Sequence, residues 1–314
     1  DTSSPEIDTG SLPDALPVWA CNAGALPANG MLSVGPWQCD CNLSLIGHIG
    51  KCSAGDFRFD YPARDEDRLE TGNRDSDPNG IMTLSNLDWP TYRANNDRSS
   101  STTVKVTFPM KYDWELQPDR SYLPTVSTSA GNLIFSAGDD GAIRALDTDT
   151  GQLKWQYLTP APIKYPPTIW NGLLYVGGGD GYVYCLHAGT GELAWRFRAA
   201  PVDRHIMVYD RLCSTWPVHS GVLVHDEIAY AAAGIIDHDG TYVYALDART
   251  GKLIWENNSS GHLNSELRKG VSVQGNLSIL GNHLLLAGGN QISPARYDLK
   301  TGECKVSPFK QGQP

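Results

Sequence analysis

Two stretches of the chain concentrate side chains that could hold an anion or move a proton. They span residues 198–221 and 256–270. Imidazole and phenol groups act as general acids and bases, and guanidinium and ammonium groups bind carboxylates and phosphates. The candidate catalytic residues are His205, Tyr209, His219 and His262, and the candidate ligand-binding residues are Arg204, Arg211, Trp216, Arg268 and Lys269.

This set of residues suits an anionic ligand such as a polysaccharide, with a lyase or hydrolase as the corresponding enzyme. The alternative is that the same groups pair with one another inside surface loops. His219 lies in the strand-like pattern of residues 216–224, which favours a structural role for this histidine over a catalytic one.

The seven cysteines raise a second chemical possibility near the N-terminus. Four of them, Cys21, Cys39, Cys41 and Cys52, lie close together in the sequence. Cys39 and Cys41 with the nearby His48 could bind a metal ion, but no C-x-x-C pair of the usual zinc site is present. The favoured interpretation is at least one disulfide in an oxidising compartment, with no metal at Cys39, Cys41 and His48.

Composition and missing motifs exclude several classes of protein. The net charge of −10 disfavours nucleic-acid binding, which needs clustered lysine and arginine. No apolar run is long enough to span a bilayer. The acidic turns of residues 138–141, 178–181 and 237–240 lack the ligand count of a calcium-binding EF-hand loop. The chain begins with Asp1 and shows no signal peptide, so we expect a mature or trimmed form.

A repeat of about forty to sixty residues organises the rest of the chain. Its copies are marked by Thr-Gly pairs that end at Gly151, Gly191, Gly251 and Gly302. In the second copy, residues 166–199, Asn-Gly, Asp-Gly and Thr-Gly pairs separate four short hydrophobic runs. Such pairs supply the positive φ angles of tight hairpin turns. The pattern predicts an all-β protein, a β-propeller built from four-stranded antiparallel blades.

A tryptophan recurs at the same offset from the Thr-Gly pair. Trp155, Trp195 and Trp255 each follow the pair by four residues, and alanine precedes it at Ala145 and Ala245. We expect each indole to pack across a small residue of a neighbouring blade. The predicted structural residues are therefore Trp155, Trp195, Trp255, Gly151, Gly191 and Gly251.

The pattern A-x-D-x-x-T-G-x-x-x-W, complete from Ala145 to Trp155 and from Ala245 to Trp255, resembles the repeat of pyrroloquinoline-quinone (PQQ) dehydrogenases. It also resembles cofactor-free propellers with the same repeat, including an outer-membrane assembly lipoprotein, and the C-terminal half of large bacterial PQQ-repeat proteins. The resemblance covers residues 88–304 and implies seven or eight blades if the ring is closed. Residues 88–100 resemble a first blade strand and residues 112–116 a fourth.

The chain departs from that family pattern in ways that bear on cofactors. Cys185 and His187 replace the Ala and Asp in the second copy, and Cys304 replaces the last Trp. The vicinal cysteines and the calcium ligands of the dehydrogenases have no counterpart here. We therefore expect neither PQQ nor calcium, and a PQQ-dependent dehydrogenase is the least favoured of the functions.

The sequence predicts five segments. These are an extended arm at 1–17, a Cys-containing diverged blade at 18–60, an acidic linker or surface excursion at 61–87, the repeat propeller at 88–305 and a tail at 306–314. Only five or six blades are visible in this division. An incomplete ring would need another protein chain, or a second copy, to complete it.

The predicted function is a non-catalytic β-propeller outside the cytoplasm, periplasmic or extracellular, that serves as a binding or assembly module in a larger complex. The alternative is the polysaccharide enzyme that acts through the loop histidines, tyrosine and arginines.

Overall fold

The computed structural model describes residues 25–28, 31–34, 49–52, 64–72, 84–105, 108–110, 112–118, 121–208, 211–262, 270–289 and 292–305. The chain divides into two units: Asp1–Phe57 with Met207–Asp210, and Arg58–Ile206 with Arg211–Pro314. The predicted arm and tail lie outside the described residues. Among those that are described, no helix has both the length and the apolar character needed to cross a membrane.

The first unit contains an antiparallel sheet of three strands in the order β1-β2-β3. Its strands are β1 (Ala25–Ala28), β2 (Met31–Val34) and β3 (Ile49–Cys52). β1 and β2 pair from Ala25 opposite Val34 to Ala28 opposite Met31, so a two-residue Asn-Gly connection separates them. Such a meander is also the arrangement of the first strands of a blade.

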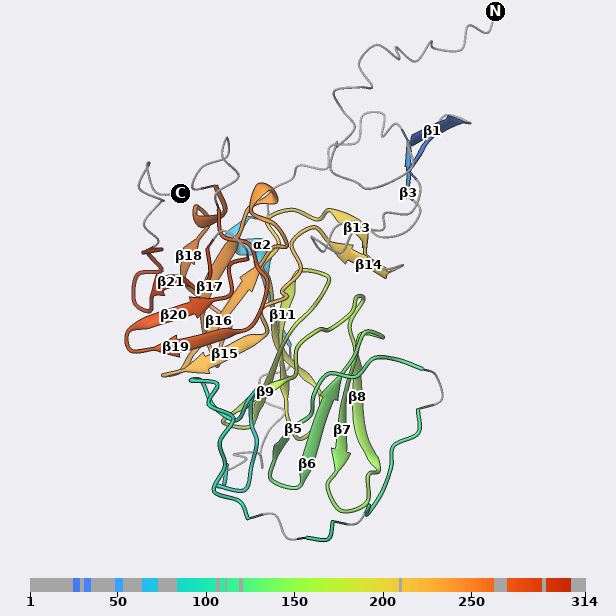
Figure 1. Ribbon diagram of the computed structural model, residues 1–314, viewed down its shortest axis with the longest axis vertical. Coiled ribbons are helices and arrows are strands. Elements are labelled where there is room, and N and C mark those ends of the chain that lie inside the picture. The colour runs from blue at the N-terminus through green and yellow to red at the C-terminus, as the bar shows by residue number, and fades with distance from the viewer. Residues whose placement is uncertain are drawn as a thin grey trace, which may run out of the picture. The chain divides into compact units, whose positions relative to one another are not determined.

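The second unit contains four antiparallel sheets that follow one another along the chain (Figure 1). We name them blades A to D. Blade A comprises β5 (Thr128–Ala130), β6 (Leu133–Ala137), β7 (Ala142–Asp147) and β8 (Leu153–Leu158). Blade B comprises β9 (Thr168–Trp170), β10 (Leu173–Gly177), β11 (Tyr182–His187) and β12 (Leu193–Arg198).

Blade C comprises β15 (Val222–His225), β16 (Ile228–Ala233), β17 (Tyr242–Asp247) and β18 (Leu253–Asn257). Blade D comprises β19 (Leu277–Leu280), β20 (His283–Leu286) and β21 (Ala295–Asp298), and a bridge between Tyr297 and Cys304 marks its fourth strand. In blades A to C the register between the third and fourth strands shifts at the same place, after Ala145, Cys185 and Ala245.

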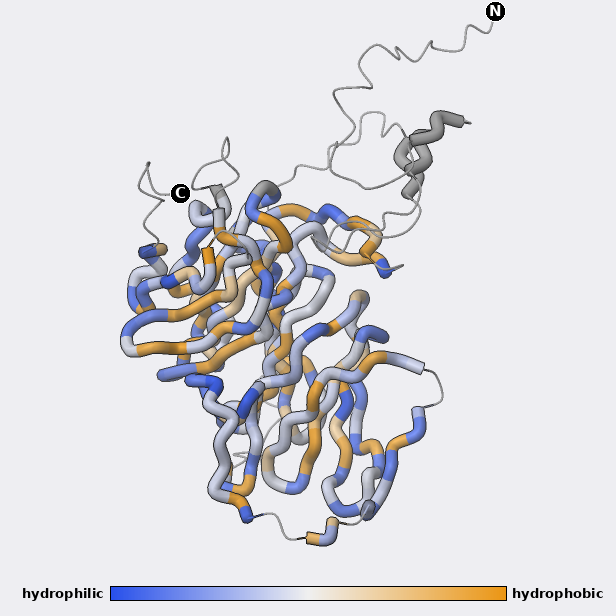
Figure 2. Tube along the Cα trace, in the orientation of Figure 1, coloured by the Kyte–Doolittle hydropathy of each residue, from blue (hydrophilic) through white to orange (hydrophobic). Residues whose placement is uncertain are grey.

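Consecutive blades bury a hydrophobic layer between them. Phe135 and Ile143 of blade A pack against Leu174 and Tyr184 of blade B. Similar layers join blade B to blade C and blade C to blade D. Along the tube in Figure 2, hydrophobic residues follow the strands and hydrophilic residues mark the turns, as expected when both faces of a blade are covered. The predicted all-β propeller architecture is confirmed, and the structure does not show a closed ring.

The remaining elements are short. They are α2 (Asp65–Arg68), β4 (Leu69–Thr71), β13 (His205–Val208), β14 (Arg211–Ser214), η2 (Asp237–Asp239) and η3 (Ser260–His262). β4 adds a fifth strand to the outer edge of blade B, antiparallel to β12. Part of the segment predicted as a linker or excursion, residues 64–72, thus lies against a blade.

Residues 88–100 and 112–116 differ from their predicted form. The sequence pattern suggested a first and a fourth blade strand, but the structure has only an isolated bridge between Trp89 and Ser129, and no strand at 112–116. The physical reason is that residues 88–100 lie across the first strands of several blades instead of alongside one, so no continuous ladder can form.

Candidate binding site

The tryptophans of the repeat pack on the Thr-Gly turn of the following blade. Trp155 Nε1 donates to the carbonyl oxygen of Ala188 at 3.0 Å, and its ring covers Gly191. Trp195 and Trp255 make the same contact with Ala248 and Leu299. In each case the acceptor lies three residues before a glycine with a positive φ angle, Gly191, Gly251 or Gly302. These tryptophans therefore have structural contacts that leave little of Trp195 or Trp255 for a ligand.

The structure adds a fourth member to this set that the sequence analysis missed. Trp114 Nε1 donates to the Thr148 carbonyl at 2.8 Å, and its ring covers Gly151. The docking contact is thus present although residues 112–118 form no strand. This tryptophan lies in the stretch "YDWEL" of residues 112–116. No Thr-Gly pair precedes it by four residues, so the repeat pattern did not identify it.

The Asp of the motif holds the turn on which the indole rests. Asp147 Oδ1 accepts hydrogen bonds from the backbone N–H and the hydroxyl of Thr150, and Asp247 does the same for Thr250. The hydrogen bonds from Lys154 and Thr150 lower the pKa of Asp147 to about 2. Both carboxylates are engaged in these turn contacts, so they serve the fold.

Two of the predicted ligand-binding residues meet in the long loop between blades B and C. The Arg204 guanidinium lies over the Trp216 ring, 4.6 Å from its centre. Arg204 also contacts Asp239 at 3.7 Å and donates to the Thr215 hydroxyl. Trp216 is buried, and its Nε1 donates to the Asp239 carbonyl. The Arg204–Trp216 pair is therefore engaged by Thr215 of its own loop and by Asp239 of η2 in blade C.

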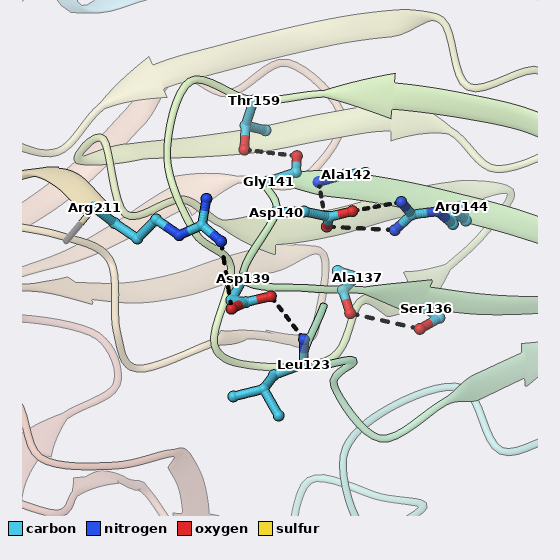
Figure 3. A network of polar contacts seen from close by, with 10 residues as sticks. All are labelled: Leu123, Ser136, Ala137, Asp139, Asp140, Gly141, Ala142, Arg144, Thr159 and Arg211. Carbon is cyan, nitrogen blue, oxygen red and sulfur yellow. Dashed lines mark hydrogen bonds and ion pairs between the residues drawn. The ribbon is translucent and has the colours of Figure 1, made fainter. Parts of the chain in front are cut away.

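Arg211 belongs to a separate polar network at the β6–β7 turn of blade A (Figure 3). Its guanidinium lies 3.8 Å from a carboxylate oxygen of Asp139, which also accepts from the Leu123 backbone N–H. The adjacent Asp140 pairs with Arg144 and accepts from the Ala142 N–H. Burial by itself would raise the pKa of Asp140, but these bonds outweigh it and lower the pKa.

The candidate catalytic residues are not brought together in one constellation by any described contact. His205 is exposed, and its Nδ1 lies 3.4 Å from Asp203 in the same loop. His219 is buried, and neither of its ring nitrogens has a hydrogen-bond partner in the described structure. Burial, with a contribution from Lys164, lowers the pKa of His219 well below its usual range, so the ring is neutral at pH 7.

Several predicted residues lie outside the described part of the chain. They are Cys21, Cys39, Cys41, His48, Tyr209, Arg268 and Lys269, and for His262 and Cys52 only the backbone is described. The disulfide and the metal alternative at Cys39, Cys41 and His48 stay predictions for that reason. Of the described cysteines, Cys185 and Cys213 are buried thiols, and burial raises the pKa of each. No group of three His, Cys, Asp or Glu side chains that could hold a metal occurs among the described residues.

The segment of residues 88–100 contacts the first strands of all four blades. Trp89 exchanges two backbone hydrogen bonds with Ser129 of β5, and the Pro90 carbonyl accepts from Ile169 of β9. The Asn96 side-chain amide donates to the Val224 carbonyl of β15 at 2.8 Å, and the Asn96 backbone carbonyl accepts from the Ile279 N–H of β19. This is where the first strands of successive blades lie next to one another, so the segment occupies a surface that could otherwise be open to a ligand.

Arg98 anchors the end of this segment. Its Nε donates to the Leu277 carbonyl at 2.8 Å, and its Nη1 donates to the Thr91 hydroxyl and the Tyr92 carbonyl. Burial lowers the pKa of Arg98 to about 10, which still leaves it charged at neutral pH. A charge that is mostly buried and bonded to carbonyl oxygens indicates a structural clamp.

A shallow groove of about 350 Å³ opens beside blade A. It is lined by Leu116, Gln117, Pro118, Asp140, Arg144, Leu146, Leu153 and Gln156. The polar groups there are already paired in part, because Arg144 bonds Asp140 and lies 4.3 Å from the centre of the Tyr122 ring. The groove therefore fits a peptide or side chain of mixed character better than a free anion.

Comparison with two solved dehydrogenases supports the fold. The chain resembles the solved quinohemoprotein alcohol dehydrogenase of Comamonas testosteroni at 16% identity and a TM-score of 0.55, over 74% of this chain and 43% of that one. A europium-containing methanol dehydrogenase is similar at 12% identity and a TM-score of 0.54, over 69% and 48%. BamB of Moraxella catarrhalis matches at 20% identity and a TM-score of 0.41, over 57% and 46%. This chain spans less than half the length of each.

No curated protein sequence matches the chain. A family profile does match, over residues 111–311, and its description is "Outer membrane protein assembly factor BamB". The matched region contains blades A to D with the Thr-Gly turns and their tryptophans. The chain therefore belongs to this family of PQQ-repeat β-propellers.

Proposed function

We propose that this chain is a non-catalytic β-propeller that binds another polypeptide and serves in a larger assembly outside the cytoplasm. The observation that carries the proposal is a series of exposed large hydrophobic side chains between residues 104 and 126, beside blade A. They include Phe108, Met110, Tyr112, Leu123 and Val126. A run of exposed large apolar side chains along one segment favours a role in binding a protein partner.

The state of the candidate catalytic and ligand-binding residues favours binding of a polypeptide over an enzyme that acts on an anionic polysaccharide. Arg204 and Arg211 are paired with carboxylates, Trp216 is buried, and His219 is neutral and buried. The surface of the first strands is covered by residues 88–100. The family's description, an outer membrane protein assembly factor, supports both an assembly role and a location outside the cytoplasm. We also propose that residues 18–60 form a diverged blade, because β1, β2 and β3 pair in sequence order as antiparallel strands.

The test measures partner binding and catalysis on the same sample. The full chain, with any leader its gene encodes, is expressed in its native host and cross-linked in the cell envelope. We expect one protein partner in fixed ratio, and a Tyr112→Ser, Leu123→Ser variant that still folds but loses it. The matched control is Lys300→Ser, an exposed residue of blade D.

Two results on the purified chain, and one from the cross-linking, would contradict the proposal. One is a rise in ultraviolet absorbance when the purified chain is incubated with a uronate polymer, as a lyase produces, provided that His205→Ala abolishes it. The other is a visible absorbance from a bound quinone. The lack of any partner at cross-linking, with a correctly folded chain, also counts against it.

A further inference from the structure

The outer edge of blade B shows how this chain covers the last strand of a blade. β4 pairs antiparallel with β12, with Leu69 opposite Phe197, Glu70 opposite Arg196 and Thr71 opposite Trp195. The Leu69 side chain and the Trp195 ring both lie against Gly251, and Glu70 forms an ion pair with Arg196 at 2.7 Å. With this fifth strand in place, only 1% of Trp195 is exposed.

β8 is the equivalent strand of blade A, and no strand of the described residues pairs with its outer edge. Alignment on the Thr-Gly turns places Trp155 at the position of Trp195 and Tyr157 at that of Phe197. Both aromatic residues are half-buried here, and Leu153 and Leu158 are 51% and 66% exposed. An exposed edge strand with this much apolar surface pairs readily with another strand.

The outer strand of blade C is less open, although it too lacks a fifth strand among the described residues. In β18 the Trp255 ring is 9% exposed, and the Asn257 amide bonds the Gly302 carbonyl. Glu256 is approached by Arg68 at 3.9 Å. β8 therefore stands out as the outer edge whose aromatic side chains are incompletely covered.

We infer that β8 pairs with β8 of a second copy of this chain, antiparallel about a two-fold axis at Gln156. This goes beyond the proposed function by adding a second interaction surface, β8, whose partner is another copy of the chain. The two blades then form one continuous sheet in which β8 meets β8 of the other copy. Closed two-fold pairing is the usual way in which identical chains associate.

The register follows from the residues of β8. With Gln156 opposite Gln156, Trp155 of each copy lies opposite Tyr157 of the other, and Lys154 lies opposite Leu158. Aromatic pairs directly across antiparallel strands are stabilising, and no like charges face each other. The two amides can bond each other on the opposite face of the sheet. Lys154 is also neutralised within its own copy by Asp147 at 3.0 Å, so the edge carries little net charge.

A second copy fits this edge better than an acidic strand like β4. Gln156 replaces Arg196, so the ion pair that binds Glu70 on blade B has no equivalent on blade A. What remains at the edge is apolar, aromatic and amide surface, which is complementary to itself.

The test uses the full chain and measures its mass by sedimentation equilibrium from about 1 µM to about 1 mM, the range for an interface this small. We expect a monomer–dimer equilibrium. Leu158→Lys places a like charge opposite Lys154 twice per dimer and should weaken it roughly fivefold to tenfold. Leu158→Glu, the matched control at the same exposed position, should retain or strengthen it.

A second variant tests the register directly. Gln156→Cys brings two thiols opposite each other, so mild oxidation should trap a dimer that reducing agent releases. Gln152→Cys, in the exposed turn of the same blade, and the unmodified chain should give no more than background cross-linking.

The inference fails if the chain is monomeric throughout, or if both Leu158 variants change the dimer equally. It also fails if Gln156→Cys traps no more dimer than Gln152→Cys. A monomeric chain that still binds a different protein in the cell envelope would overturn this inference and leave the proposed function standing.

Discussion

At the scale of single residues, the repeat motif is a set of reciprocal contacts. The Asp carboxylate accepts a hydrogen bond from the Thr hydroxyl and so holds the Thr-Gly turn. The tryptophan ring of the preceding blade packs on this turn, and its N–H donates to the carbonyl three residues before the glycine. Gly191 has a φ angle of 76°, and a Cβ there would lie 2.5 Å from the Trp155 ring. Only glycine meets both requirements, which is why each copy conserves the pair while its flanking residues vary.

Gly191→Ala should therefore destabilise the protein by about 2–4 kcal/mol, from the left-handed backbone angle and the forced displacement of the indole. Gly189→Ala is the matched control, because nothing lies within 4 Å of its added methyl group. Urea unfolding of both variants measures the difference. Equal stabilities would show that the indole does not rest on this turn.

Two aspartates should respond to pH with opposite signs. Burial raises the pKa of Asp180, which bonds the Tyr184 hydroxyl and the Tyr182 N–H. Because the pKa of Asp180 is higher in the folded state, the protonated carboxyl contributes its full stability below the pKa of the unfolded chain, near 4. That stability is lost as the pH rises through the pKa of the folded state. Asp180→Asn should remove this loss and make the variant at least as stable as the parent at pH 7.

Asp147 behaves in the reverse way, because its pKa is lowered to about 2. Its contribution is present above pH 4 and is lost as pH falls through about 2, so Asp147→Asn should weaken the protein at neutral pH. Thermal melts of both variants from acid to neutral pH test the pair. The same slope in the two variants would contradict the assignment.

At the scale of elements, residues 88–100 connect four blades that are otherwise joined only to their neighbours. Asn96 spans two of them, with its side chain on blade C and its backbone carbonyl on blade D. The segment satisfies donors and acceptors of the first strands that would otherwise be unpaired edges. It therefore holds the arc of blades from its inner side, as the tryptophans do from the outer side.

Asn96→Ala should cost about 1 kcal/mol, the value of one partly buried hydrogen bond. The effect should also appear as faster amide exchange in β15 and β19. Asn95→Ala is the control, because the Asn95 side chain bonds only the exposed Ser99 in the described structure. Unchanged exchange in β15 and β19 would mean that the segment does not clamp these blades.

At the scale of the whole molecule, the blades at the two ends of the described array differ from those between them. Arg144 of blade A stands where blades B and C have Tyr184 and Tyr244. Arg296 of blade D stands where the others have Ala145, Cys185 and Ala245. The sequence predicts an incomplete ring that another chain, or a second copy, would complete. In both end blades an arginine takes the place of a buried residue of the internal blades, so these two faces are more polar than an internal blade face at those positions.

Arg296→Leu should make the outer face of blade D resemble an internal blade face and promote aggregation. Lys300→Leu, in the exposed turn of the same blade, changes the charge equally and should have little effect. Static light scattering against concentration compares them. Equal scattering from the two variants would indicate that the face at Arg296 is covered by other residues or by a partner.

The repeat, the strand order within each blade and the role of the Thr-Gly turns followed from the sequence alone. Hairpin turns and the alternation of buried residues are local properties, and four copies of the same local pattern reinforce one another. The fold class and the family could be predicted for that reason, and both are confirmed.

The tertiary structure alone decided what the irregular segments do. Contacts with parts of the chain that are far away in the sequence are made by residues 88–100, Trp114 and β4. The local sequence pattern of these segments does not indicate which parts they contact. The same holds for the candidate site. The residue types suggested ligand binding or proton transfer. The tertiary structure instead pairs Arg204 and Arg211 with carboxylates and buries Trp216 and His219, because of which loops and strands meet. A side chain's chemistry depends on its surroundings, and only the folded chain supplies them.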